Sequence, residues 1–169
     1  MTIKNERKMK KISLNKLIQK YRILVQKLVS IVENAETDAV ALMRLSQIND
    51  PEIQGSISLN PNTPSKVLEN WLSVHNGIGG TDTEWRIHIV YNPSLRLDVL
   101  KQIIKKDKSK EVKEAALAAL ALRISRNSKA TSEELLRVYK LIGKNINNRK
   151  RKKAAMEALK KHPKFSIKA

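Results

Sequence analysis

Apolar side chains recur at intervals of three and four residues from Leu14 to Val32, which is the spacing of one face of a helix. This pattern predicts a helix that runs from Ser13 to about Glu33. A second helix is expected over residues 37–47, where the apolar set includes Leu42 and Leu45. Both helices are amphipathic, so each should bury one side against other elements.

Further along the chain the pattern repeats. Residues 50–61 are similar to residues 82–93, and each segment ends in Asn-Pro and is followed by a short amphipathic helix. A residue before proline is disfavoured in the α region, so Asn60 and Asn92 should each end a helix. A fainter repeat relates residues 112–120 to 151–159, and His162 then stands before a proline where an asparagine would be expected.

One helix start is signalled between these repeats. Thr131 and Glu134 form a capping box, which predicts a helix over residues 132–142. Repeats of roughly 30–40 residues, each holding a pair of short helices, are typical of α-solenoids. The expected fold is therefore all-α: a short right-handed α-solenoid of three to four helical repeats with an N-terminal helical cap. The expected divisions are a basic flexible arm at 1–11, an N-terminal helical segment at 12–47, and a helical-repeat domain at 48–169 with a basic C-terminal end.

The segment from Asn60 to Leu72, Asn-Pro-Asn-Thr-Pro-Ser-Lys-Val-Leu-Glu-Asn-Trp-Leu, resembles the variant leucine-rich repeat family. In that family Asn-Pro-x-Thr-Pro precedes a leucine-containing helix, and an acidic turn and a Val-Arg segment follow. Residues 82–93 are similar, with Trp85-Arg86 in the place of Val-Arg. The resemblance covers about residues 48–122, and the C-terminal part is more similar to HEAT repeats. It implies a stack of helices that serves as a binding scaffold, since such folds carry no single activity.

Charge is distributed unevenly, and this gives the main indication of function. The net charge is +7 over residues 1–22, −4 over 23–100 and +15 over 101–169, which makes +18 for the chain. Two basic ends around an acidic middle indicate a directed surface for a polyanion. We therefore expect non-enzymatic binding to a nucleic-acid backbone, with DNA slightly favoured over RNA. Base reading is not expected, because Trp71 and Trp85 occupy core positions of helices and no aromatic RNA-recognition motif is present.

The candidate contacts to phosphate fall into three groups. The strongest is a run of five cations that opens a predicted helix, which is unfavourable for the helix dipole unless an anion binds. The second is a set of cations that share helical faces, and the third is the N-terminal arm. The residues are Arg149, Lys150, Arg151, Lys152 and Lys153 in the run; Arg137, Lys140, Lys144, Lys101 and Lys105 on helical faces; and Lys8, Lys10 and Lys11 in the arm.

Two other functions remain open at this point. A protein–protein adaptor could grip an acidic partner, and the acidic middle of the chain would then be a separate surface. A helical-repeat DNA glycosylase is a minor alternative, because Trp71, Trp85, Asp82 and Asp98 are the residue types that such enzymes use. The sequence motifs favour no enzyme: the three histidines lack metal-ligand spacing, and neither a phosphate loop nor a nucleophile elbow occurs.

Composition sets the remaining bounds. The chain has no cysteine, which excludes disulfides and thiolate metal sites and fits a reducing compartment. We expect no cofactor and no metal. We also expect no membrane partner, because no stretch approaches the roughly 18 apolar residues of a membrane span. We expect a cytoplasmic location, which includes association with a nucleoid. If the source is a eukaryote, the expected location is the nucleus.

Overall fold

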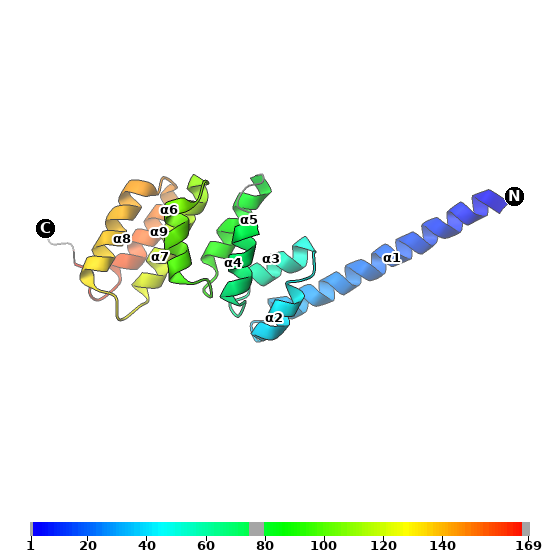
Figure 1. Ribbon diagram of the computed structural model, residues 1–169, viewed down its shortest axis with the longest axis horizontal. Coiled ribbons are helices and arrows are strands. Elements are labelled where there is room, and N and C mark those ends of the chain that lie inside the picture. Colours follow the sequence, from blue (N-terminus) through cyan, green and yellow to red (C-terminus); the bar gives the residue numbers. More distant parts are fainter. Residues whose placement is uncertain (1, 75–79, 167–169) are drawn as a thin grey trace. The chain divides into compact units, whose positions relative to one another are not determined.

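The computed structural model describes residues 2–74 and 80–166, and all regular structure in these ranges is helical (Figure 1). It thereby confirms the expected all-α class. Nine helices are present in the described part of the chain, and they divide into two compact units, the first ending at Thr63 and the second beginning at Pro64. The helices are α1 Thr2–Glu33, α2 Ala39–Leu45, α3 Pro51–Leu59, α4 Ser65–Val74, α5 Gly80–Tyr91, α6 Leu97–Lys106, α7 Lys110–Ser125, α8 Ser132–Asn145 and α9 Arg149–Lys160.

The first unit is built around the contact of α3 with the C-terminal part of α1. Val25 and Val32 of α1 and Ile53 and Ile57 of α3 are buried. Asp50 caps α3, because its carboxylate accepts hydrogen bonds from the backbone N–H groups of the second and third helical residues. The Tyr21 hydroxyl donates to the other oxygen of Asp50 at 2.6 Å, which ties α1 to the start of α3.

Helix α1 begins much earlier than the apolar pattern predicted. We expected a flexible arm over residues 1–11 and a helix from Ser13, whereas α1 starts at Thr2. The first eleven residues lack apolar periodicity, but most of them are good helix formers such as Lys, Arg, Glu and Met. Once a helix has nucleated over residues 14–33, extension into such a segment adds one hydrogen bond per residue at little cost.

Helix α7 is the centre of the second unit. It packs against α5, α6, α8 and α9, and nearly all of its middle is buried. Alanines at 115, 116, 118, 119 and 121 make this possible, because small side chains let neighbouring helices approach from every side. Buried leucines and isoleucines of the surrounding helices, including Leu100, Leu135 and Leu159, complete one continuous core.

A single turn geometry recurs along the chain. At five places in the described chain, the backbone N–H of residue i+2 donates to the side chain of the turn residue i, at 2.8–3.1 Å. The backbone N–H of residue i+3 donates to the carbonyl of the same turn residue. This is the side-chain-to-backbone turn that asparagine forms readily. The turn residues are Asn34, Asn60, Asn92, Asn127 and His162.

In the last of these turns His162 takes the place of asparagine, as the sequence repeat indicated. The Lys164 N–H donates to Nδ1 of His162, so the ring proton lies on Nε2, which faces the Asn127 carbonyl at 3.1 Å. The ring therefore accepts within its own turn and donates to the preceding one. Asn60 does the same in the first unit, where its amide nitrogen donates to the Asn34 carbonyl at 3.0 Å.

A buried ion pair joins helices of the second unit at the ends that lie away from these turns. Arg86 on α5 binds Asp107, which lies between α6 and α7, and both side chains are almost fully buried. The second oxygen of Asp107 accepts from the Ser109 N–H at 2.8 Å, one residue before α7 begins. The pair therefore joins three helices at one point.

The two tryptophans pack in the core, as their helical positions predicted. Trp71 of α4 and Trp85 of α5 lie with ring centroids 5.2 Å apart and are partly buried against the core. Tyr139 and Phe165 form a similar tilted pair at 5.2 Å. Such offset pairs are a stable arrangement for aromatic rings inside a protein.

Candidate nucleic-acid interface

Two basic segments meet at one end of the second unit. Only Asp107, Lys108 and Ser109 separate α6 from α7, and only residues 146–148 separate α8 from α9. Because these hairpins are short and α7 packs on both α6 and α9, the ends of α6 and α8 lie beside the starts of α7 and α9 (upper side of this unit in Figure 1). A hydrogen bond from the Asn148 N–H to the Glu114 carboxylate, at 3.2 Å, joins the two hairpins.

Eight cations converge at this end, which we call the basic edge: Lys105, Lys106, Lys108, Lys110, Lys113, Lys144, Arg149 and Lys150. Seven of these side chains are exposed and Lys113 is half-buried. Within the described residues, none of the eight forms an ion pair with a carboxylate. The basic edge therefore carries a surplus of positive charge, although Glu111 in the first turn of α7 and the buried Glu114 lie at the same end.

Part of the basic edge surrounds a hollow of about 420 Å³ between α6, α7 and α8. Its lining includes the apolar side chains of Leu117 and Leu141 together with those of Lys110, Lys113 and Lys144. The buried carboxylate of Glu114 also lines it and is held by the Asn148 N–H. Three lysines around one hollow can point their ammonium groups at a common anion.

The helix termini add to this electrostatic field. The first turns of α7 and α9 lie at the basic edge and carry the positive ends of the helix dipoles, although Ser109 caps the Val112 N–H and Asn148 caps the Arg151 N–H. The first turn of α9 has no acidic residue, although acidic residues are favoured there. Lys105, Lys106 and Lys144 lie in the last turns of α6 and α8, where cations are favourable.

The run of five cations at the start of α9 divides into two groups. Arg149, Lys150 and Lys153 are exposed, and Lys153 lies 3.9 Å from Glu157 one turn along the helix. Lys152 is half-buried and its ammonium donates to the Gly143 carbonyl at 2.6 Å. The half-buried Arg151 lies beside the Tyr91 hydroxyl, whose pKa is raised by burial and lowered in part by this guanidinium. Lys152 and Arg151 thus make contacts within the fold.

The remaining predicted cations lie on exposed helix faces or in the first unit. Lys101 stands one turn before Lys105 on α6, and Arg137 and Lys140 lead along α8 to Lys144; all are exposed. These two rows end at the basic edge. The N-terminal residues Lys8, Lys10 and Lys11 belong to α1 in the other unit, where the structure describes the helix but not these side chains.

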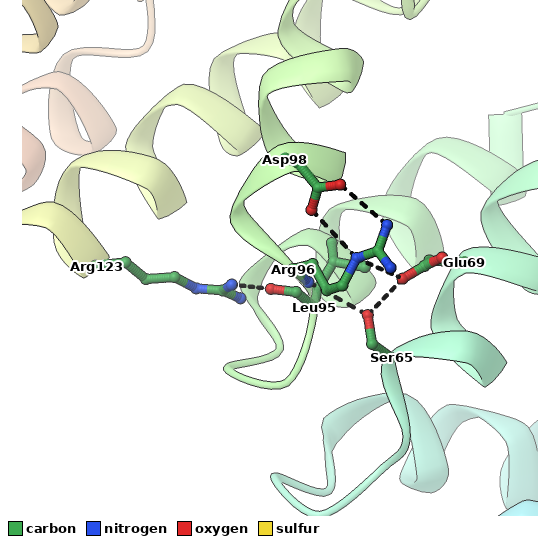
Figure 2. Close-up of polar contacts among 6 residues, drawn as sticks. All are labelled: Ser65, Glu69, Leu95, Arg96, Asp98 and Arg123. Atoms are coloured by element: carbon green, nitrogen blue, oxygen red, sulfur yellow. Dashed lines mark hydrogen bonds and ion pairs between the residues drawn. The ribbon is translucent and has the colours of Figure 1, made fainter.

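Other cations of the second unit are occupied by structural contacts. Figure 2 shows Arg96 between Asp98, at 3.0 Å, and Glu69, at 3.5 Å. Ser65 donates to Glu69 at 2.7 Å and accepts from the Arg96 N–H at 3.3 Å, which links α4 to the start of α6. Arg123 donates to the carbonyls of Leu95 and Asn92 and so closes a turn. These arginines are thus already bound to protein groups.

Sequence reasoning missed half of the basic edge, namely Lys106, Lys108, Lys110 and Lys113 as contact residues. The signal was present, because residues 105–113 hold five lysines in nine positions. A search for cations that share one helix face does not group them, because they lie on two helices and the link between these. The short link between α6 and α7 instead gathers the end of one helix and the start of the next at one place.

The structure also places the residues that suggested other chemistry. Among residues 2–74 and 80–166, no group of three or more His, Cys, Asp or Glu side chains could hold a metal ion. Of the four residues that suggested a glycosylase, Trp71 and Trp85 pack on each other and Asp98 pairs with Arg96; the side chain of Asp82 lies outside the described part. No helix of the described chain has the length and apolar character needed to cross a membrane.

Comparisons with protein-family models, with curated proteins and with solved structures found no match to this chain. The resemblance to variant leucine-rich repeats therefore stays a prediction that rests on the Asn-Pro segments themselves.

Proposed function

We propose that this protein binds the phosphate backbone of nucleic acid through the basic edge, without reading base sequence and with DNA slightly favoured over RNA. The observation that carries the proposal is the gathering of eight unpaired cations at one end of the second unit. Each phosphate that such cations neutralise releases condensed counterions, and this release drives sequence-independent binding.

The proposal includes the finer fold: a right-handed α-solenoid of three to four repeats, for which α1 forms the N-terminal cap. The recurring turns support it, because each of the turns at Asn60 and His162 donates to the turn before it. In a solenoid, equivalent helix ends stack along one edge. That stacking sets the α6–α7 and α8–α9 links side by side, so the cations of the basic edge form a row, which suits a polymer of phosphates.

The hollow at the basic edge favours one second candidate, an adaptor that grips an acidic protein partner. Its lining of apolar side chains and three lysines could hold an amphipathic acidic helix as well as a phosphate. The two functions differ in their response to salt. An adaptor should bind one protein with a modest dependence, whereas a nucleic-acid backbone gives a steep one.

The test is a titration of the purified protein with duplex DNA, single-stranded DNA and RNA of unrelated sequences over a salt series. Four to eight phosphate contacts predict a log–log slope of roughly −4 to −7 on duplex DNA. Affinity should vary little among sequences of one type. Absence of binding to all three at about 50 mM salt would contradict the proposal and leave the adaptor.

A further inference from the structure

The first unit leaves a row of large apolar side chains exposed on α1. The row alternates in steps of three and four residues, which is the a/d pattern of a coiled coil. Leu14, Leu17, Leu24 and Ile31 are 49–63% exposed, although such residues are usually covered. We call this row the α1 seam: Leu14, Leu17, Tyr21, Leu24, the half-buried Leu28, and Ile31.

The rest of the first unit is too short to cover the seam. With 32 residues α1 is about 48 Å long, while the nine-residue α3 that packs on it is about 14 Å long. That contact buries Val25 and Val32, which lie beside the seam, and it leaves Leu24 and Ile31 exposed. Most of a helix's stability in a protein comes from the packing of its apolar face, so the uncovered seam favours contact with another surface.

The charges near the two ends of α1 indicate which partner covers the seam and in which direction that partner runs. The first eleven residues carry five cations and one carboxylate, whereas residues 33–38 carry three carboxylates and no cation. The carboxylates of Glu33, Glu36 and Asp38 are on exposed residues. A second α1 in the opposite direction would set its basic start beside these carboxylates. A parallel copy would instead set two basic starts side by side, which like charges oppose.

We propose that two copies of this chain associate through the α1 seam in an antiparallel coiled coil. In such a pairing a positions meet d positions, so Leu14 lies opposite Ile31 of the second copy, Leu17 opposite Leu28, and Tyr21 opposite Leu24. All six seam residues then find a partner. Tyr21 keeps its hydrogen bond to Asp50 at the start of α3, and this residue is 55% exposed. This pairing does not depend on the proposed nucleic-acid binding.

Light scattering of the nuclease-treated full chain tests the association. The expected mass is twice 19.2 kDa. Leu17→Asp with Leu24→Asp should give single chains, whereas Ile23→Asp should leave the dimer intact, because Ile23 is equally exposed but lies on the opposite side of α1. A single-chain mass for the unaltered protein at all concentrations would overturn the proposal, whether or not it then bound vesicles or another protein.

Cross-linking tests the direction, and the chain suits it because it has no cysteine. Leu14→Cys and Ile31→Cys are prepared separately, mixed, and treated with a short bismaleimide. The antiparallel pairing predicts links between the two variants and few within either alone. Equally strong links within each variant would show a parallel pair and overturn the proposal. Ile23→Cys is the matched control and should not link.

Discussion

Asn60 is a single residue that stabilises two turns. Its side-chain oxygen accepts from the Asn62 N–H at 2.8 Å, and its amide nitrogen donates to the carbonyls of Val32 and Asn34. Because Asn60 is buried, Asn60→Ala leaves these groups without their partner, at a cost of about 1–3 kcal/mol. Urea denaturation followed by circular dichroism should show this loss in the free energy of unfolding.

Asn127 provides the matched control for that prediction. It forms the same kind of turn through the Lys129 N–H at 3.1 Å, but it is exposed to solvent. Water can replace a lost hydrogen bond there, so Asn127→Ala should cost only about 0.5 kcal/mol. Equal losses for the two variants would mean that burial does not set the importance of these turns.

The Tyr21–Asp50 contact predicts a pH dependence. The hydrogen bond from Tyr21 lowers the pKa of Asp50, and the same bond raises the pKa of Tyr21. A lowered carboxyl pKa stabilises the fold above the unfolded value of 3.8, and this stabilisation is lost as pH falls through the folded value. A raised phenol pKa stabilises below 10.0 and is lost as pH rises through the folded value.

Tyr21→Phe should therefore be less stable than the unaltered chain between these limits. The difference in the free energy of unfolding should shrink below pH 3.8 and above pH 10, as the carboxylate is protonated or the phenol ionises. Urea titrations at a series of pH values measure it. A difference that stays constant from pH 3 to pH 11 would show that the hydrogen bond does not contribute.

At the scale of elements, the Arg86–Asp107 pair holds α5, α6 and α7 together. Asp107→Asn removes the charge but keeps an oxygen for the Ser109 N–H. It removes the negative charge that Asp107 sets beside a buried guanidinium, so unfolding should become easier by about 3–5 kcal/mol. Asp98→Asn is the control, because it breaks an exposed pair with Arg96 that should contribute about 0–1 kcal/mol. Similar melting temperatures for both variants would contradict this account.

Helices and turns were the most predictable part of this chain. The Asn-Pro pairs marked the ends of α3 and α5, and the Thr131 hydroxyl accepts from the Glu134 N–H at 3.1 Å, as the capping signal predicted. Local chemistry decides these features, so a single sequence reveals them. The start of α1 was less predictable, because helix extension through residues 2–13 depends on propensity rather than on an apolar pattern.

The candidate site was less predictable because it depends on tertiary contacts. The five cations at 149–153 are alike in sequence, yet Arg151 and Lys152 contact Tyr91 and Gly143 while Lys150 is free. Lys110 and Lys113 stood out only once the α6–α7 link placed them beside Lys144. Composition indicated a polyanion, but only the fold separates cations that hold the protein together from cations that remain available.

At the scale of the whole molecule, the central claim is that one end of the second unit carries the binding. Two variants that lose the same charge distinguish binding at the basic edge from a general attraction of nucleic acid to a basic protein. The first replaces Lys110, Lys113, Lys144 and Lys150 by Gln at the basic edge. The second replaces Arg126, Lys129, Lys160 and Lys161 by Gln, all of them exposed and located at the other ends of the same helices.

The deciding measurement is the salt dependence of duplex-DNA affinity for both variants and the unaltered chain, with circular dichroism to confirm that each is folded. If the basic edge contacts the backbone, the first variant should flatten the log–log slope by roughly 2–4 units. The second should change it by less than about one unit, although it loses the same charge. Equal changes for the two variants, or no change for the first, would contradict the claim that nucleic acid binds at the basic edge.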